Sequence, residues 1–112
     1  MQKRIVVSLQ VEGLHCWPEC PIEEVKFLRD CHRHIFFVTA KKVVQHNDRD
    51  IEIIQLKRAM EYAIKRRFLN DHGICDFGRL SCEDLAEWFM KEFNLTYCKV
   101  LEDNENGAEI IR

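Results

Sequence analysis

The first residues of the chain alternate regularly between apolar and more polar side chains. Over residues 3–12 the regularly spaced apolar positions are Ile5, Val7, Leu9 and Val11. Because side chains two residues apart in a strand lie on the same face, this pattern predicts a half-buried β-strand. Gly13 follows and is expected to loosen the chain before His15.

Three more segments have the composition of strands. Residues 33–45 begin with a run of aromatic and β-branched residues, Ile35-Phe36-Phe37-Val38, which favours a second strand. A third strand is predicted at residues 96–101 and a short fourth one at 108–112. Asn106-Gly107 lies between these two and suits a two-residue type I′ turn, so they are expected to form a hairpin.

Two helices are predicted between the strand pairs. The first runs from about Asp50 to Leu69, with apolar residues at helical spacing on one face: Ile53, Leu56, Met60, Ala63, Ile64 and Phe68. The second opens at Ser81, a good N-cap, and Asp84 three residues later approximates a capping box. Its apolar face is formed by Leu85, Ala86, Phe89 and Phe93, and Asn94 is expected to end it.

The predicted order of elements is therefore β-β-α-α-β-β in a single domain of residues 1–112. This order predicts the α+β class, with a four-stranded antiparallel sheet and two helices on one of its faces. The other face and the two edge strands would remain uncovered. Because open sheet edges need partners or protection, we expect a homo-oligomer.

Charge and hydropathy exclude several classes of partner. The formal net charge is −2, so no general attraction to nucleic acid or to an anionic membrane is expected. No apolar run is long enough to span a membrane and the first residues lack a signal-peptide pattern, so we expect a cytoplasmic protein.

Six cysteines are present, but Cys16 and Cys20 have no second matching pair for a zinc knuckle. Cys82 and Cys98 fall inside predicted elements and are expected to be small buried hydrophobes.

The most informative chemical pattern is a set of three histidines. His32 and His34 are two residues apart at the start of the second predicted strand, so their imidazoles should project from the same face. If the first two strands pair, His15 comes alongside them. Three neutral imidazoles with an open fourth position form a catalytic type of zinc site, so we predict Zn²⁺ at this position. The alternative is a strand that merely starts with two polar residues.

The order of elements and the three histidines together resemble the tunnelling fold (T-fold). More specifically, they resemble the family of 6-pyruvoyl- and 6-carboxy-tetrahydropterin synthases. In that family a His that ends the first strand and both histidines of a His-Gly-His motif starting the second strand bind zinc. His15, His32 and His34 match those positions, with Arg33 in place of the glycine.

Shorter motifs extend the resemblance over nearly the whole chain. Asp48-Arg49-Asp50 and Leu56-Lys57 correspond to the acidic start of the family's first helix and its Leu-Lys pair. Ser81-Cys82-Glu83-Asp84-Leu85-Ala86 is a close variant of the family's Thr-x-Glu-Asn-x-Ala motif. Glu102 falls where the family has a glutamate that anchors the pyrimidine-like edge of a pterin.

The resemblance implies roles for five further residues. Cys31 would be the proton-abstracting base, and Asp71 with His72 would correspond to the family's Asp-His dyad. Glu102 and Glu83 would bind the ligand, although Glu83 also suits the helix dipole and Glu102 a solvated turn. Cys31 departs from the family pattern, because it is adjacent to the His-x-His motif rather than a few residues before it.

Two function classes follow from the resemblance. The first is a zinc-dependent, pterin synthase-like lyase that acts on a pterin or purine-like small molecule at a subunit interface. The second is a non-catalytic T-fold module that binds or sequesters a ligand of the purine nucleotide type. In either case the family precedent implies trimers stacked into hexamers, or tetramers.

Overall fold

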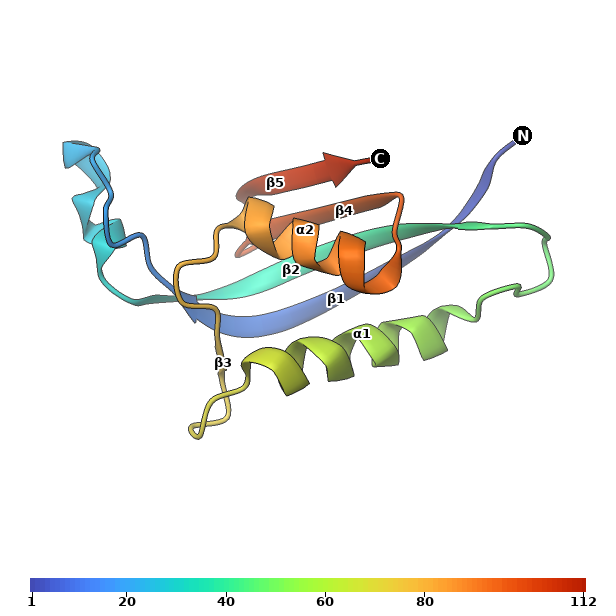
Figure 1. The fold of residues 1–112 in the computed structure, drawn as a ribbon, viewed down its shortest axis with the longest axis horizontal. Helices are drawn as coiled ribbons and strands as arrows, with labels where there is room; N and C mark the ends of the chain where they lie inside the picture. Colours follow the sequence, from blue (N-terminus) through green and yellow to red (C-terminus); the bar gives the residue numbers. More distant parts are fainter.

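The computed structural model describes residues 1–112 and has the α+β architecture (Figure 1). The strands are β1 (Lys3–His15), β2 (His32–Val44), β3 (Cys75–Asp76), β4 (Tyr97–Glu102) and β5 (Asn106–Ile111). The helices are α1 (Ile53–Phe68), α2 (Cys82–Phe93) and a 3-10 helix at Glu23–Arg29. The strands form one open, mixed sheet in the order β3-β1-β2-β4-β5.

The α+β class and both antiparallel strand pairs are confirmed, but the sheet has five strands and not the four predicted. The additional strand, β3, pairs in parallel with β1 through Gly13 and Leu14. It is only two residues long, and a segment this short has no alternation of polarity by which a sequence could reveal it. β1 also runs through Gly13 to His15, so this glycine does not loosen the strand as we expected.

The two long strands pair without interruption over 13 residues, from Lys3 opposite Val44 to His15 opposite His32. Alternate residues of both strands therefore lie on one face, which is the face covered by the helices. The buried core unites this face with residues of both helices: Val7, Leu9, Val11, Phe36, Val38, Ala40, Cys98 and Val100 from the sheet, and Met60, Ile64, Leu85, Ala86, Phe89 and Met90 from the helices. The prediction of two helices on one face agrees with this core.

Gly13 belongs to the helix-covered face and leaves room for an aromatic ring. A Cβ atom at this position would lie 2.2 Å from Cε2 of Phe77 and 3.1 Å from Cε2 of Phe36. No side chain can occupy that space, so the glycine is required by close packing and not by chain flexibility.

The helix ends follow the predicted signals closely. Ser81 caps α2, and the reciprocal hydrogen bonds of a capping box join it to Asp84. Asn94 ends α2 in the left-handed conformation. Helix α1 begins later than predicted, because Glu52 caps it while the carboxylate of Asp50 accepts a hydrogen bond from the backbone N–H of Gln45.

The predicted turn of the C-terminal hairpin was misplaced. Asp103 and Asn104 both have positive φ angles and form the turn, whereas Asn106 and Gly107 belong to β5. Asp and Asn tolerate the left-handed conformation, so they suit a type I′ turn as well. A Cβ atom on Gly107 would lie 1.9 Å from the backbone oxygen of Val100, so this glycine allows β5 to approach β4.

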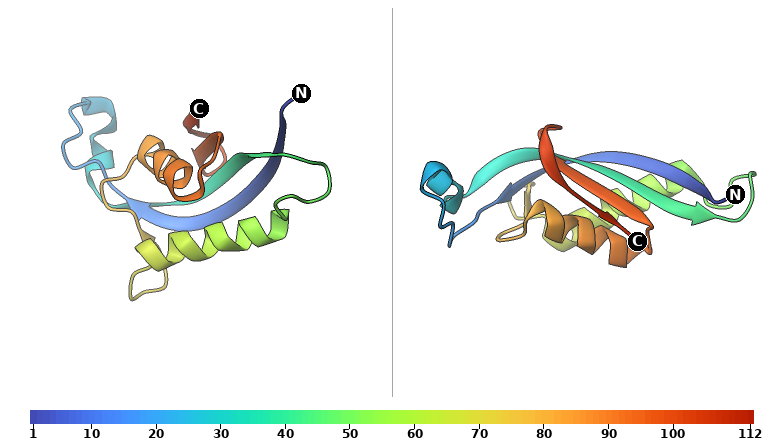
Figure 2. Two further views of the ribbon diagram at one scale, coloured as in Figure 1. Left: turned by 45° about the vertical axis from the view of Figure 1, so that its right-hand side comes forward. Right: turned by 90° about the horizontal axis from the view of Figure 1, so that it is seen from above.

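The sheet is long and curved, and α2 lies against β4 and β5 while α1 lies along β1 (Figures 1 and 2). The opposite face of the sheet carries no helix, and Val6 on it is 52% exposed. The segment between β1 and β2 projects beyond one end of the sheet. No helix has the length and apolarity needed to cross a membrane.

Candidate metal centre

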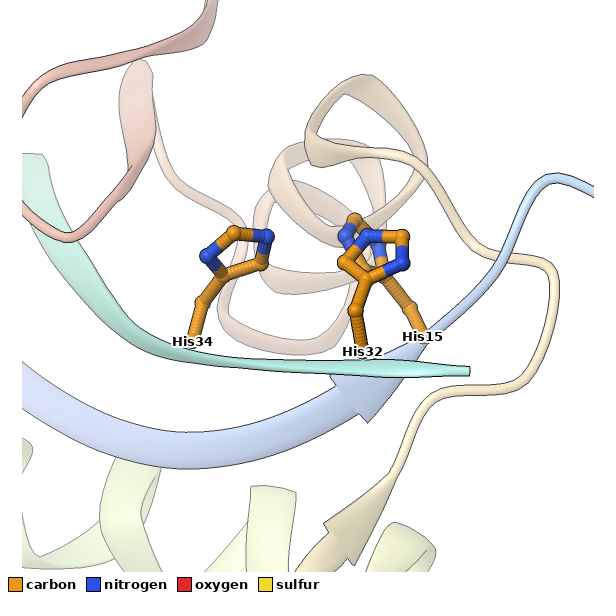
Figure 3. A group of neighbouring side chains, drawn as sticks. All are labelled: His15, His32 and His34. Carbon is orange, nitrogen blue, oxygen red and sulfur yellow. The ribbon is translucent and has the colours of Figure 1, made fainter. Parts of the chain in front are cut away.

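Three histidine side chains converge at one end of the sheet (Figure 3). His15 is the last residue of β1, and His32 and His34 lie at the start of β2. The strand register places His15 opposite His32 and Gly13 opposite His34, so all three rings lie on the helix-covered face. One potential ligand atom from each ring lies within 4.8 Å of the others, as the sequence pattern predicted. The cluster could therefore hold a metal ion.

Each histidine ring is oriented by a hydrogen bond from its Nδ1 atom. His15 Nδ1 is 2.9 Å from the backbone oxygen of Leu80, and His32 Nδ1 is 2.8 Å from that of Asp30. His34 Nδ1 is 2.7 Å from Oδ2 of Asp103. Carbonyl and carboxylate oxygens only accept hydrogen bonds, so Nδ1 must be the protonated nitrogen of each ring. Each neutral ring then presents the lone pair of Nε2.

Two of these Nε2 atoms, those of His15 and His34, are buried without a hydrogen-bond partner. Buried polar atoms normally have a hydrogen-bond partner. Two ring nitrogens in one cluster that both lack a partner therefore require an explanation. Zinc–nitrogen bonds are about 2.0–2.1 Å long, so nitrogens bound to one zinc ion lie roughly 3.4 Å apart. One ligand atom from each ring already lies within 4.8 Å of the others, so the residues fit a metal ion.

The cluster rests on aromatic residues of the core. The ring of Phe36 packs edge to face against His15 and His34, with centroids 5.2 and 5.7 Å apart, and Phe77 packs against Phe36 in turn. Burial lowers the pKa of His15 below its ordinary value, although the Leu80 carbonyl and Glu102 oppose that shift. The lowered pKa favours the neutral form of His15, which is the form that binds a metal.

Glu102 projects into the same cluster from β4. It pairs with Phe36 of β2, and its side chain shares the face of His34. Its Oε2 lies 3.0 Å from His15 Nε2 and its Oε1 lies 3.6 Å from His34 Nε2. The residue that we expected to face a ligand therefore also faces the metal position.

A cavity of about 620 Å³ opens beside the histidines. Its lining includes two of the three histidines, both glutamates predicted to bind a ligand, and residues of the segment after β1: His15, His32, Glu102, Glu83, Cys16, Trp17 and Leu28. Glu83 is exposed in the first turn of α2, so it can both face a ligand and complement the helix dipole. Arg79 and Glu19 form an ion pair within this lining.

The three residues predicted as catalytic do not line this cavity. Cys31 is exposed and precedes the first residue of β2. Asp71 and His72 are exposed in the turn between α1 and β3, where Asn70 accepts a hydrogen bond from the backbone N–H of His72.

Sequence reasoning missed three residues of the site. Asp103 orients His34, and this hydrogen bond is the main reason why the pKa of Asp103 is lowered. Cys16 lines the cavity, and so does Cys82, whose pKa is raised to about 12 by burial and by the nearby Glu102 carboxylate. Cys16 follows His15 directly, and Asp103 follows Glu102, so adjacency to a predicted site residue was the available signal.

Comparison with models of protein families and with characterised proteins found no match to this chain. Its function is therefore inferred from the site itself.

The hydrogen bond from His34 to Asp103 gives a direct test of the site. Oδ1 of Asp103 also accepts from the backbone N–H of Ile35 at 3.0 Å. In Asp103→Asn only one oxygen acceptor remains for these two donors, so His34 should be oriented less firmly. Partners of this kind typically contribute tenfold to a hundredfold to metal affinity, so we expect zinc binding to weaken by about tenfold or more. Competition with a coloured chelator measures this, and Glu105→Gln in the same turn is the matched control. Equal affinities in all three proteins would contradict the orienting role.

Proposed function

We propose that the protein is a zinc-binding T-fold protein, similar to the 6-pyruvoyl- and 6-carboxy-tetrahydropterin synthases, that binds a pterin or purine-like molecule beside the metal. The observation that carries this proposal is the convergence of three histidines whose Nδ1 atoms are all hydrogen-bonded to oxygen acceptors. Their remaining nitrogens lie together, and two of them are buried without partners. This donor arrangement is typical of a built metal site.

Zinc is the metal that suits these ligands best. Imidazole nitrogen favours zinc, copper, iron and nickel over magnesium and calcium, and zinc commonly takes three histidines in catalytic sites. A bound zinc ion supplies Lewis-acid polarisation of an oxygen substituent on a ligand. The protein's own part is to hold the three rings in one orientation through the acceptors at Leu80, Asp30 and Asp103.

The cavity supports a small planar ligand. Its volume of about 620 Å³ falls in the range of small-molecule sites. Trp17 offers an aromatic face, and Glu102 and Glu83 offer carboxylates. A carboxylate accepts two parallel hydrogen bonds from an N–H/NH₂ edge, which pterins and guanine possess and adenine lacks.

Binding without catalysis is the form of this function that the geometry favours. Cys31, Asp71 and His72 lie outside the cavity, so one chain brings no predicted acid or base to the ligand. The second candidate is the zinc-dependent lyase. It is favoured by Cys16, a half-exposed thiol in the cavity wall that would have to replace Cys31. Asp71 and His72 would contribute only if a neighbouring subunit placed them at the site.

We further propose a homo-oligomer formed through the sheet edges. β5 has a neighbour on one side only, and β1 is covered by β3 only at Gly13 and Leu14. Exposed edges with free backbone groups favour pairing with another strand.

The metal site predicts a simple pattern of zinc content. Protein purified without chelators should carry about one zinc ion per chain. Replacing His15, His32 or His34 by Ala should reduce that content to a small fraction, because two imidazoles no longer hold the ion firmly. Elemental analysis measures the content, and His46→Ala and His72→Ala serve as controls that should keep it. Zinc loss in the controls, or retention in all three site variants, would refute the site.

The position of Glu102 in the cavity predicts which class of small molecule the protein should bind. In zinc-saturated protein, Glu102→Ala should weaken the binding of a pterin or a guanine nucleotide by roughly tenfold to a hundredfold, because the ligand's two N–H donors lose their acceptor. Calorimetric titration of the wild type and the variant measures this, with an adenine nucleotide as the ligand control. Equal affinities in both proteins, or no binding by the wild type, would remove the case for a pterin-like ligand.

The open sheet edges predict that the protein is an oligomer in solution. Light scattering at micromolar concentration should give a mass at least twice the chain mass of 13.4 kDa. A monomer at that concentration would exclude assembly through the sheet edges and any ligand site that requires a second subunit.

A further inference from the structure

The carboxylate of Glu102 has an unusual environment. Its side chain is 31% exposed, and its only charged-group neighbours within ion-pair distance are the histidines. No lysine or arginine pairs with it. Its two oxygens instead approach two different rings, at 3.0 Å from His15 Nε2 and 3.6 Å from His34 Nε2.

These contacts are not hydrogen bonds. Both Nε2 atoms lack a hydrogen-bond partner in spite of the carboxylate nearby. Since the protonated nitrogen of each ring is Nδ1, a neutral ring directs a lone pair from Nε2 toward the carboxylate. Two lone pairs facing an anion repel it, and a cation between them turns this repulsion into attraction. A single metal ion satisfies both rings and the carboxylate at once.

We propose that Glu102 is the fourth ligand of the metal bound by His15, His32 and His34. This inference rests on the proposed metal site and deepens it. Four protein ligands close a tetrahedral site, whereas three leave a position open. The resting site is therefore closed, and a molecule that enters the cavity must displace the carboxylate to reach the metal.

Displacement would restrict the class of ligand. A ligand that brings its own oxygen to the metal releases Glu102, and the freed carboxylate can then accept hydrogen bonds from an N–H/NH₂ edge. The best ligand carries both groups, as a heterocycle with a hydroxylated or carbonyl side chain does. A heterocycle without a metal-binding oxygen leaves Glu102 on the metal and binds weakly.

Cobalt(II) tests the proposal because its visible absorption reports the number and kind of its ligands. The metal-free wild type, Glu102→Gln and Glu102→Ala are titrated with cobalt(II) alone. Glu105→Gln is the matched control, because Glu105 is exposed in the turn that follows Glu102 and pairs with no histidine. Groups that only hydrogen-bond to a metal ligand contribute about tenfold or more to metal affinity. Loss of a ligand itself should therefore raise the dissociation constant for cobalt(II) at least tenfold. The absorption band should also shift or weaken in both Glu102 variants and remain unchanged in Glu105→Gln.

A second measurement reports on the carboxylate itself. The infrared difference spectrum between zinc-loaded and metal-free wild type should show a shifted carboxylate band, which Glu102→Gln should lack. A wild type that binds cobalt with a band and an affinity shared by both Glu102 variants would overturn the fourth ligand and leave the three-histidine site intact. A wild type that binds neither cobalt nor zinc would overturn the metal site and this inference together.

Discussion

The unbroken register between β1 and β2 is the constraint on which the site depends. Thirteen consecutive pairs place His15 opposite His32 and keep His34 on the same face. Because side chains alternate, a slip of one residue would move a histidine to the other face and destroy the cluster together with the core. Gly13 keeps the strand regular beside the ring of Phe77. The same pairing thus builds the hydrophobic core along most of its length and the histidine cluster at its end.

The site is prepared by groups that are not themselves ligands. Two backbone carbonyls and the Asp103 carboxylate fix the tautomer of the three rings, and they come from three different connections in the chain. Asp103 lies in a turn with a positive φ angle, which holds its carboxylate against both the His34 ring and the backbone of β2. Rings oriented in this way need little reorganisation when they bind an ion, which favours affinity.

Much of this architecture could be read from the sequence, because it depends on local patterns. Alternation revealed the strands, the Ser81–Asp84 spacing revealed the cap of α2, and the His32–His34 spacing revealed two ligands on one face. β3 could not be predicted, since two residues carry no periodic signal. The hairpin turn was misplaced because Asn-Gly is the stronger turn signal, whereas the tertiary approach of β5 to β4 required Gly107 within the strand. Roles that depend on long-range contacts, such as that of Asp103, have no local pattern.

The departures from the pterin-synthase pattern are not equivalent in their effect on the site. Arg33 stands where that pattern has a glycine between its two histidines. Alternation directs Arg33 to the opposite face, where it pairs with Glu12, so it leaves the histidine cluster undisturbed. The position of Cys31 matters more, because this exposed thiol is not among the residues that line the cavity. Cys82 is inside the cavity wall, but its pKa of about 12 keeps it protonated at neutral pH. One chain therefore brings the three histidines and Glu102 together, whereas the predicted acid and base residues do not line the cavity beside them.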